Sequence, residues 1–267
     1  MTPGRSDGTH TAVAVAARCG LVTRGVLYLL VGLLALRVAF GHSGKEADRT
    51  GALAELADHP YGRVLVWAVG IGLVAMALWR LSEAVFGGTG PDGRKWSKRT
   101  ASAGRFLFYV VAAYSALSFA AGRGGHRSGD EQSRDATARF LDLPAGPWLV
   151  GLAGAAIAVG GVVIAVSAVR LTFRKEMDTA RLPEGVRRAV DVLGVVGGTA
   201  RGAVFTAAGV FVCYAAVSYD PGKAKGLDDT LRTFAQTPAG PWLLVAVAVG
   251  LLLFGLFSWA QAAWRRI

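Results

Sequence analysis

Long apolar segments without a charged residue recur along the chain, separated by shorter polar segments. Five such uncharged runs contain between 16 and 32 residues each. A further run from Gly25 to Phe40 is interrupted only by Arg37, near its end, where a long side chain can reach the membrane surface. Because about 20 apolar residues cross a bilayer as a helix, the pattern predicts six transmembrane helices. They cover residues 21–40, 62–84, 104–122, 146–169, 199–219 and 240–262.

The composition supports this membrane assignment. Apolar residues make up 53% of the 267 residues, charged residues make up 18%, and the mean hydropathy is +0.42. A disordered chain is excluded because the apolar fraction is too high, and soluble domains carry about 25% charged residues. We therefore predict an all-α membrane protein, with residues 1–267 in a single membrane domain.

The net charge of +11 is divided unevenly between the two sides of the predicted helices. Both termini and the segments 80–105 and 170–201 carry 18 Lys and Arg residues, whereas the segments on the other side carry ten. Because short basic segments stay in the cytoplasm, this count predicts a multi-pass protein of the cytoplasmic (plasma) membrane with both termini cytoplasmic. The basic side would contact anionic membrane lipids. Nucleic acid is a poor explanation of the charge, because no soluble module remains to bind it.

A short motif repeats on the less basic side. Pro-Ala-Gly-Pro-Trp occurs twice, and a related Pro-Tyr-Gly occurs earlier in the chain. In each copy an arginine opens the preceding apolar run, 36, 39 and 37 residues before the proline. This spacing predicts three copies of a two-helix unit, at residues 16–88, 98–172 and 190–266. The motif residues are Pro60, Gly62, Pro144, Gly146, Trp148, Pro238, Gly240 and Trp242.

The motif is typical of a helix start. Proline lacks a backbone donor and suits the first helical turn, and the tryptophans would lie at the level of the lipid headgroups. Ahead of each proline, apolar residues spaced three apart among polar residues indicate a short amphipathic helix in the outer interface. These pairs are Leu53 and Leu56, Phe140 and Leu143, and Leu231 and Phe234.

Two helices per copy let all three copies enter the membrane in the same direction, so the repeats are parallel rather than inverted. Three such hairpins could close around a pseudo-threefold axis, and an irregular bundle is equally compatible with the sequence. The threefold pattern of Arg-Gly, glycine-rich helix, amphipathic lead-in, Pro-x-Gly and second helix resembles an uncharacterised family of bacterial integral membrane proteins, a domain of unknown function with three tandem two-helix repeats. The resemblance covers about residues 16–266 and implies a fold and a location, without an activity or ligand.

Charged residues at the membrane boundary are the candidate functional residues. Arg24, Arg105 and Arg201 open the first helix of each copy, and in a threefold bundle they could converge as an anion-binding ring. The other interpretation makes them interfacial anchors on lipid phosphates. Arg80 and Glu83 share one helical face at the level of Arg24. They are either a structural pair between two helices or a site that handles a proton or ligand.

The sequence contains no pattern typical of an enzyme, a cofactor site or a metal site. The histidines His42, His59 and His126 lack the spacing of metal ligands. We therefore expect a non-enzymatic protein with a structural, lipid-interacting or accessory role. The alternative is a channel or transporter for an anion or small solute, with a path between the three repeats. A homo-oligomer is compatible with the glycines of the fifth span, which favour close packing within one chain or between two.

Overall fold

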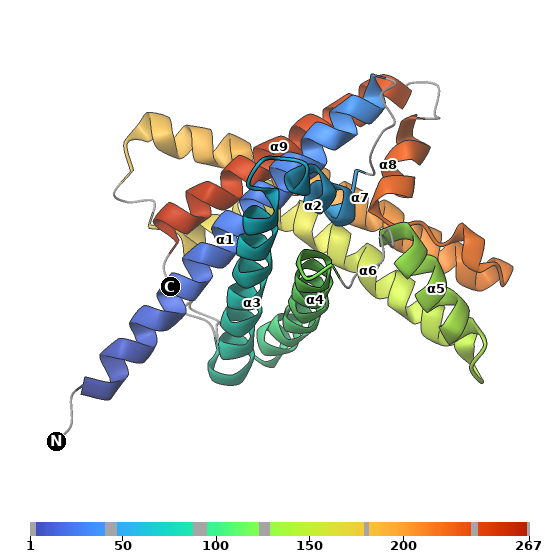
Figure 1. Cartoon of the computed structure of the whole chain (residues 1–267), viewed down its shortest axis with the longest axis horizontal. Helices are drawn as coiled ribbons and strands as arrows, with labels where there is room; N and C mark the ends of the chain where they lie inside the picture. Colours follow the sequence, from blue (N-terminus) through green and yellow to red (C-terminus); the bar gives the residue numbers. More distant parts are fainter. Residues whose placement is uncertain are drawn as a thin grey trace.

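The computed structural model describes residues 4–40, 47–87, 95–122, 129–178, 182–235 and 240–265 (Figure 1). Within these ranges the chain forms α-helices joined by short connections and two 3-10 turns. The helices are α1 (Gly4–Ala39), α2 (Arg49–Ala57), α3 (Gly62–Phe86), α4 (Trp96–Ala120), α5 (Gly129–Leu141), α6 (Gly146–Val169), α7 (Glu184–Ser218), α8 (Leu227–Ala235) and α9 (Gly240–Trp264). The turns are η1 (Thr172–Glu176) and η3 (Pro221–Lys223).

Six of these helices, namely α1, α3, α4, α6, α7 and α9, are long and apolar enough to cross a membrane. The predicted fold class, an all-α chain with six apolar spans, is confirmed. Several helices continue beyond the apolar runs, because polar residues next to a run can extend the same helix into water. α1 begins at Gly4, and α7 begins at Glu184 and reaches 35 residues, about 50 Å.

The short helices α2, α5 and α8 precede the second span of each repeat, as predicted. Leu53, Leu56 and Leu231 are buried against the spans. In the second repeat, Phe140 and Leu143 are 52% and 48% exposed. α5 buries its polar residues Asp130 and Thr137 instead, so the apolar pair does not pack on the spans, and its place in the outer interface stays a prediction. The side chain of Phe234 lies outside the described residues.

Packing between the spans follows a cyclic order. The second span of each repeat packs most extensively on the first span of the next, giving the pairs α3 with α4, α6 with α7, and α9 with α1. In Figure 1, α9 and α1 accordingly run side by side although they lie at opposite ends of the chain. Within a repeat, α1 also packs on α3 and α7 on α9, whereas α4 and α6 share no comparable interface. The arrangement is therefore a pseudo-threefold ring that is open between α4 and α6.

The glycine of the Pro-x-Gly motif is the first helical residue of α3 and of α6. The prolines Pro60 and Pro144 lie two residues earlier, in the connecting turn, so the prediction that they occupy the first helical turn was wrong. The glycine is needed because Gly62 and Gly146 pass close to the last carbonyl groups of the preceding short helix, where a side chain would collide with backbone oxygens. Gly240 likewise begins α9, and Pro238 lies outside the described residues.

Two tryptophans follow these helix starts, at Trp148 and Trp242. Their exposed fractions are 78% and 79%. Exposed indole rings at the ends of membrane-spanning helices are typical of the headgroup region.

Glycines bring α6 and α7 into backbone contact. A Cβ atom on Gly161 would lie 2.7 Å from the carbonyl oxygen of Gly202 and would also collide with Thr206, and Gly154 is packed in the same way against Gly209. These glycines therefore serve helix packing within one chain.

We expect Gly161→Ala to destabilise the protein by about 1–3 kcal/mol, because the added methyl group must push the α6 and α7 backbones apart. The adjacent Gly160 is the matched control, since a Cβ there has no neighbour within 4 Å. Gly160→Ala should leave stability unchanged or raise it slightly. Thermal unfolding in detergent, followed by circular dichroism, compares the two. Equal midpoints for both variants would contradict the packing argument.

Candidate functional site

Arg24 is buried near the start of the first span, with 8% of its surface exposed. Its Nε donates to the Ser258 hydroxyl at 3.1 Å, and its Nη2 donates to the Gln261 side-chain oxygen. Both partners belong to α9, so these bonds join the first repeat to the third. The guanidinium also lies 5.2 Å from the centre of the Phe254 ring. Each of these partners is neutral, so Arg24 is a buried cation without a countercharge from them.

Arg201 of α7 occupies the equivalent position in the third repeat and approaches Arg24. Its Nε donates to the Tyr28 hydroxyl at 2.7 Å, and its guanidinium lies 4.9 Å from the centre of the same Phe254 ring. Arg24 interacts in turn with the Tyr109 hydroxyl of α4. Tyr28 and Tyr109 each lie four residues after the arginine of their own helix. Each arginine therefore contacts the tyrosine of the following repeat in the cyclic order.

Arg80 and Glu83 form the ion pair that their spacing predicted, with Nη1 of Arg80 2.5 Å from Oε2 of Glu83. Ser102 of α4 donates to the same carboxylate oxygen at 3.2 Å. The Arg80 guanidinium stacks over the Trp79 ring at 4.1 Å from its centre. Arg80 is only 5% exposed, and its Nε is buried without a hydrogen-bond partner among the described residues.

Arg265 follows α9 and extends the same group of charges. It pairs with Glu176 of η1 at 2.7 Å, lies 3.9 Å from Glu83, and approaches the Trp79 ring from 4.7 Å. Arg265 was not among the candidate residues predicted from the sequence, because it follows the apolar run instead of lying within it.

Arg105 does not join the buried group. It is exposed on α4, within electrostatic range of Arg80, Arg201 and Glu83. The predicted convergence of the three repeat arginines is therefore incomplete. The physical reason lies in the next repeat, where Phe205 stands in place of the tyrosine and offers no hydroxyl group to a guanidinium.

We define the arginine cluster as Arg24, Arg80, Arg201 and Arg265, together with Glu83 and Glu176, and Arg105 lies exposed at its edge. Four arginines and two glutamates leave two positive charges, on Arg24 and Arg201, without a carboxylate in the cluster. Buried cations are costly unless they are paired, so the cluster is suited to an anion. Guanidinium groups bind phosphate oxygens in a bidentate manner, and the tyrosine and serine hydroxyls can add hydrogen bonds.

Gln261, Tyr28 and Tyr109 were not among the candidate site residues predicted from the sequence. Their spacing within the repeats could have identified them, because Tyr28 and Tyr109 each follow the repeat arginine by four residues. Gln261 follows Pro238 by 23 residues, the same separation as Glu83 from Pro60. An alignment of the three copies thus identifies the second-span positions that face the arginines.

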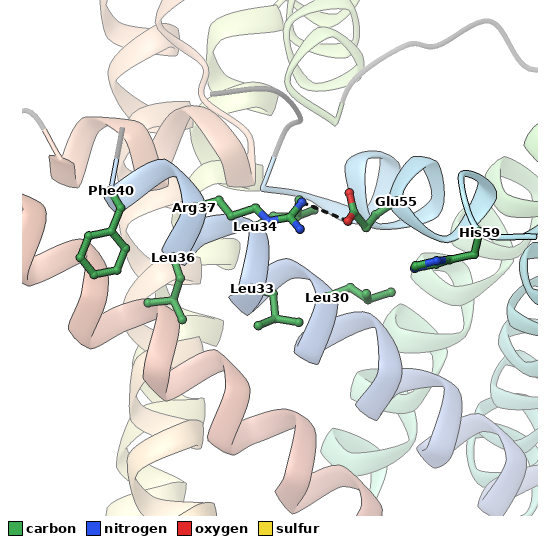
Figure 2. A pocket seen from close by; sticks show the side chains of 8 residues that line it. All are labelled: Leu30, Leu33, Leu34, Leu36, Arg37, Phe40, Glu55 and His59. Carbon is green, nitrogen blue, oxygen red and sulfur yellow. Dashed lines mark hydrogen bonds and ion pairs between the residues drawn. The ribbon is translucent and has the colours of Figure 1, made fainter. Parts of the chain in front are cut away.

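A pocket of about 580 Å³ lies at the opposite end of α1 (Figure 2). Leucines of α1 and Phe40 form its wall, and the ion pair of Arg37 with Glu55, at 3.0 Å, closes one side together with His59. The pocket is therefore largely apolar, and its two charges neutralise each other. It offers space for an apolar chain and no chemistry that selects a charged ligand.

Comparisons with known proteins agree with the repeat architecture. The family described as Domain of Unknown Function (DUF1206) matches three consecutive segments, at residues 19–87, 100–171 and 196–265. The chain belongs to this family. It is also 33% identical over 243 residues to the uncharacterized protein YxxB of Bacillus subtilis (strain 168), an alignment that covers 90% of this chain and 87% of the relative. No solved structure matches the chain. The DUF1206 match confirms the three tandem repeats.

We expect Glu83→Ala to destabilise the protein by about 3–5 kcal/mol, because it leaves Arg80 buried without its carboxylate partner. The double variant Arg80→Met/Glu83→Met should recover most of this loss. Glu184→Ala is the control, since its pair with Arg188 is 64% and 77% exposed and exposed pairs contribute at most about 1 kcal/mol. Thermal unfolding midpoints measure all three variants, and a double variant as unstable as Glu83→Ala would refute the pairing argument.

Proposed function

We propose that this protein is a non-enzymatic protein of the bacterial cytoplasmic membrane that binds a phosphate-bearing anion at the arginine cluster, above all the headgroup of an anionic lipid. The observation that carries the proposal is the excess of positive charge in the cluster together with the buried, unpartnered Nε of Arg80. An unpaired buried donor and uncompensated guanidinium groups are costly, and a phosphate group would satisfy both.

The route to the cluster supports a lipid as the source of the phosphate. Arg105 is exposed on α4, the helix that shares no comparable interface with α6. A headgroup from the surrounding membrane could reach Arg105 first and the buried arginines next. The surrounding spans expose apolar side chains along their length, which suits the acyl chains.

Binding is favoured over passage through the protein. Phe254 is 5% exposed and its ring lies against both Arg24 and Arg201. A buried aromatic ring in contact with both guanidinium groups favours a binding site over a water-filled path at this point. A channel or transporter remains the alternative function, and the experiments below distinguish it from lipid binding.

The lipid proposal is tested with protein reconstituted in nanodiscs of phosphatidylcholine with a small fraction of phosphatidylglycerol. We expect native mass spectrometry to show phosphatidylglycerol retained by the wild type, and at least tenfold weaker retention by Arg24→Gln/Arg201→Gln, because a single lost charged contact is worth about 1.5–3 kcal/mol and about 1.4 kcal/mol corresponds to tenfold. Arg188→Gln is the matched control, since it removes a charge from an exposed pair on α7.

Two further measurements separate the sources of the anion. Titration of inorganic phosphate into phosphatidylcholine nanodiscs detects binding of the free anion, and an anion-flux assay in liposomes detects transport. Saturable phosphate binding that depends on Arg24 and Arg201, without lipid selectivity, would assign the site to a soluble anion. Flux lost in the same variant would replace the binding proposal with the transporter.

The proposal includes the orientation of the protein in the membrane. With both termini in the cytoplasm, the arginine cluster would lie in the inner leaflet. The uneven distribution of Lys and Arg supports cytoplasmic termini. We expect a C-terminal alkaline phosphatase fusion to be inactive in intact cells and a C-terminal fluorescent protein fusion to fluoresce. The opposite pair of signals would place the cluster in the outer leaflet.

A further inference from the structure

Two arginines of the cluster, Arg24 and Arg201, have neutral partners and lie against the same aromatic ring. Arg24 donates hydrogen bonds to two uncharged side chains of α9, and Arg201 donates one to the Tyr28 hydroxyl. Their guanidinium groups lie 5.2 Å and 4.9 Å from the centre of the Phe254 ring. We call these two residues the arginine pair. Their two positive charges are close enough to repel each other.

The remaining charges of the cluster are either paired or screened. Arg80 pairs with Glu83, and Arg265 pairs with Glu176. Arg105 at the edge is exposed, so solvent screens its interactions with the other charges. The negative charge that the cluster lacks is therefore missing at the arginine pair.

The arginine pair also retains hydrogen-bond donors for a ligand. A guanidinium group has five N–H donors. Arg201 uses its Nε for Tyr28, and within the described residues its two Nη groups donate no hydrogen bond. Arg201 is half-buried, so part of its side chain can be reached from outside the bundle, whereas Arg24 lies deeper. An anion that contacts Arg201 would therefore approach Arg24 from the accessible side.

We propose that the arginine pair binds a phosphomonoester, the headgroup of a lipid such as phosphatidic acid, in preference to a phosphodiester. This inference rests on the proposed function and specifies the headgroup. A phosphomonoester carries a charge of about −1.5 to −2 at neutral pH and has three terminal oxygens. A phosphodiester, as in phosphatidylglycerol, carries a single negative charge and has one terminal oxygen fewer.

Both the charge and the number of oxygens favour the monoester. A phosphodiester would leave one positive charge of the arginine pair without compensation, which is costly because Arg24 is buried. A guanidinium group binds a phosphate through two parallel hydrogen bonds. Two guanidinium groups would compete for the two free oxygens of a diester, whereas the third oxygen of a monoester lets both arginines bind.

The shared ring favours one phosphate group over two. Because both guanidinium groups lie against Phe254, a single doubly charged phosphate can compensate both. A lipid with two phosphodiesters, such as cardiolipin, brings the same total charge on two separate groups. We therefore assign the site to a single phosphomonoester group.

The experiment uses the full-length protein in phosphatidylcholine nanodiscs that contain equal small fractions of phosphatidic acid and phosphatidylglycerol with the same acyl chains. We expect native mass spectrometry to show at least tenfold stronger retention of phosphatidic acid, because one additional charged contact changes affinity by that factor or more. Arg201→Gln should retain the two lipids about equally, because one uncompensated arginine remains and a phosphodiester neutralises it.

Arg188→Gln is the matched control, since it removes an arginine from an exposed pair on the same helix and should keep the wild-type preference. If Arg201→Gln does not fold, Arg24→Gln decides the question, because it also leaves one member of the arginine pair. A folded variant of either kind that keeps the tenfold preference would overturn the inference.

The remaining outcomes separate this inference from the proposed function. A wild type that retains phosphatidylglycerol as strongly as phosphatidic acid would overturn the preference for a monoester and leave anionic-lipid binding intact. Retention of neither lipid would refute the proposed function itself. Stronger retention of cardiolipin than of phosphatidic acid would overturn the assignment to a single phosphate group.

A soluble phosphomonoester is distinguished from a lipid by competition. We expect glycerol 3-phosphate in large excess to leave phosphatidic acid bound in the same nanodiscs, because the acyl chains hold the headgroup at the site. Displacement that depends on Arg201 would overturn the lipid as the source and assign the site to a soluble phosphomonoester.

Discussion

Polar groups that are buried between the helices of a membrane-spanning bundle must find partners within the protein, because burial removes them from water. This chain meets the requirement by passing contacts from one repeat to the next. Arg201 contacts Tyr28 and Arg24 contacts Tyr109 at one end. At the other end, Asp48, Asp130 and Asp228 each accept a backbone N–H at or just before the short helix of another repeat. Single hairpins could not satisfy these groups alone. The cyclic packing of second spans on the following first spans is therefore a condition for both polar layers.

The sequence was sufficient for the spans and the repeats, because each rests on local information. Apolar run length predicts a membrane-spanning helix, and the Pro-x-Gly spacing sets the register of the copies. Helix ends were less predictable: α7 begins at Glu184 because a polar segment outside the membrane has helical propensity of its own. The face that α5 buries was not predictable from its own sequence, because Asp130 accepts a hydrogen bond from the Asp229 N–H of α8 and is buried, whereas Phe140 is exposed.

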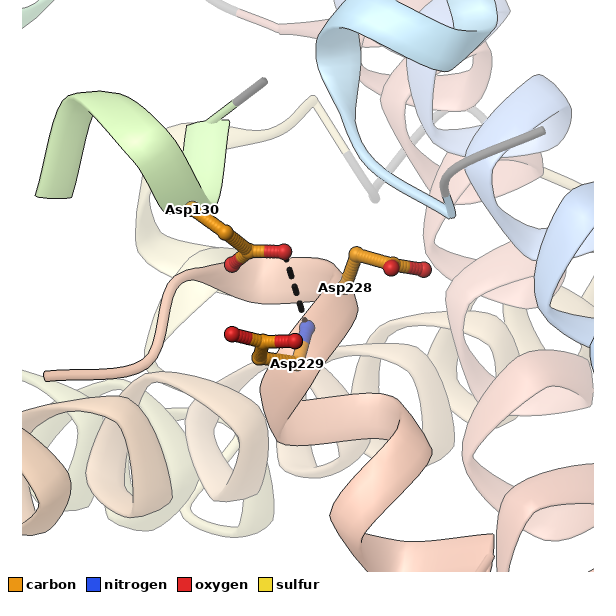
Figure 3. A group of neighbouring side chains, drawn as sticks. All are labelled: Asp130, Asp228 and Asp229. Carbon is orange, nitrogen blue, oxygen red and sulfur yellow. Dashed lines mark hydrogen bonds between the residues drawn. The ribbon is translucent and has the colours of Figure 1, made fainter. Parts of the chain in front are cut away.

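The candidate site was predictable only in its charged members. Arg24, Arg80, Glu83 and Arg201 were visible as charges beside apolar runs, and the pair of Arg80 and Glu83 followed from helical spacing. Their neutral partners Ser258 and Gln261 lie more than 230 positions from Arg24 in the sequence. The grouping of Asp130 with Asp228 and Asp229 (Figure 3) is similar, because residues of two repeats meet only after the repeats pack together. Spacing along a single helix contains no information about such contacts, although alignment of the copies places Gln261 at the position of Glu83.

One position of the repeat differs between the three copies, and the difference shows which side chain the packing of the helices requires there. The position that follows the motif proline by 20 residues holds Arg80, Ile164 and Ser258 in the three copies. Ser258 shows that a neutral residue is enough to bind the facing arginine. A scaffold alone would therefore not require a buried arginine at this position in the first copy, and Arg80 adds a charge and an unpartnered donor. The anion that we propose would offset this cost, because a phosphate oxygen can accept a hydrogen bond from the free Nε.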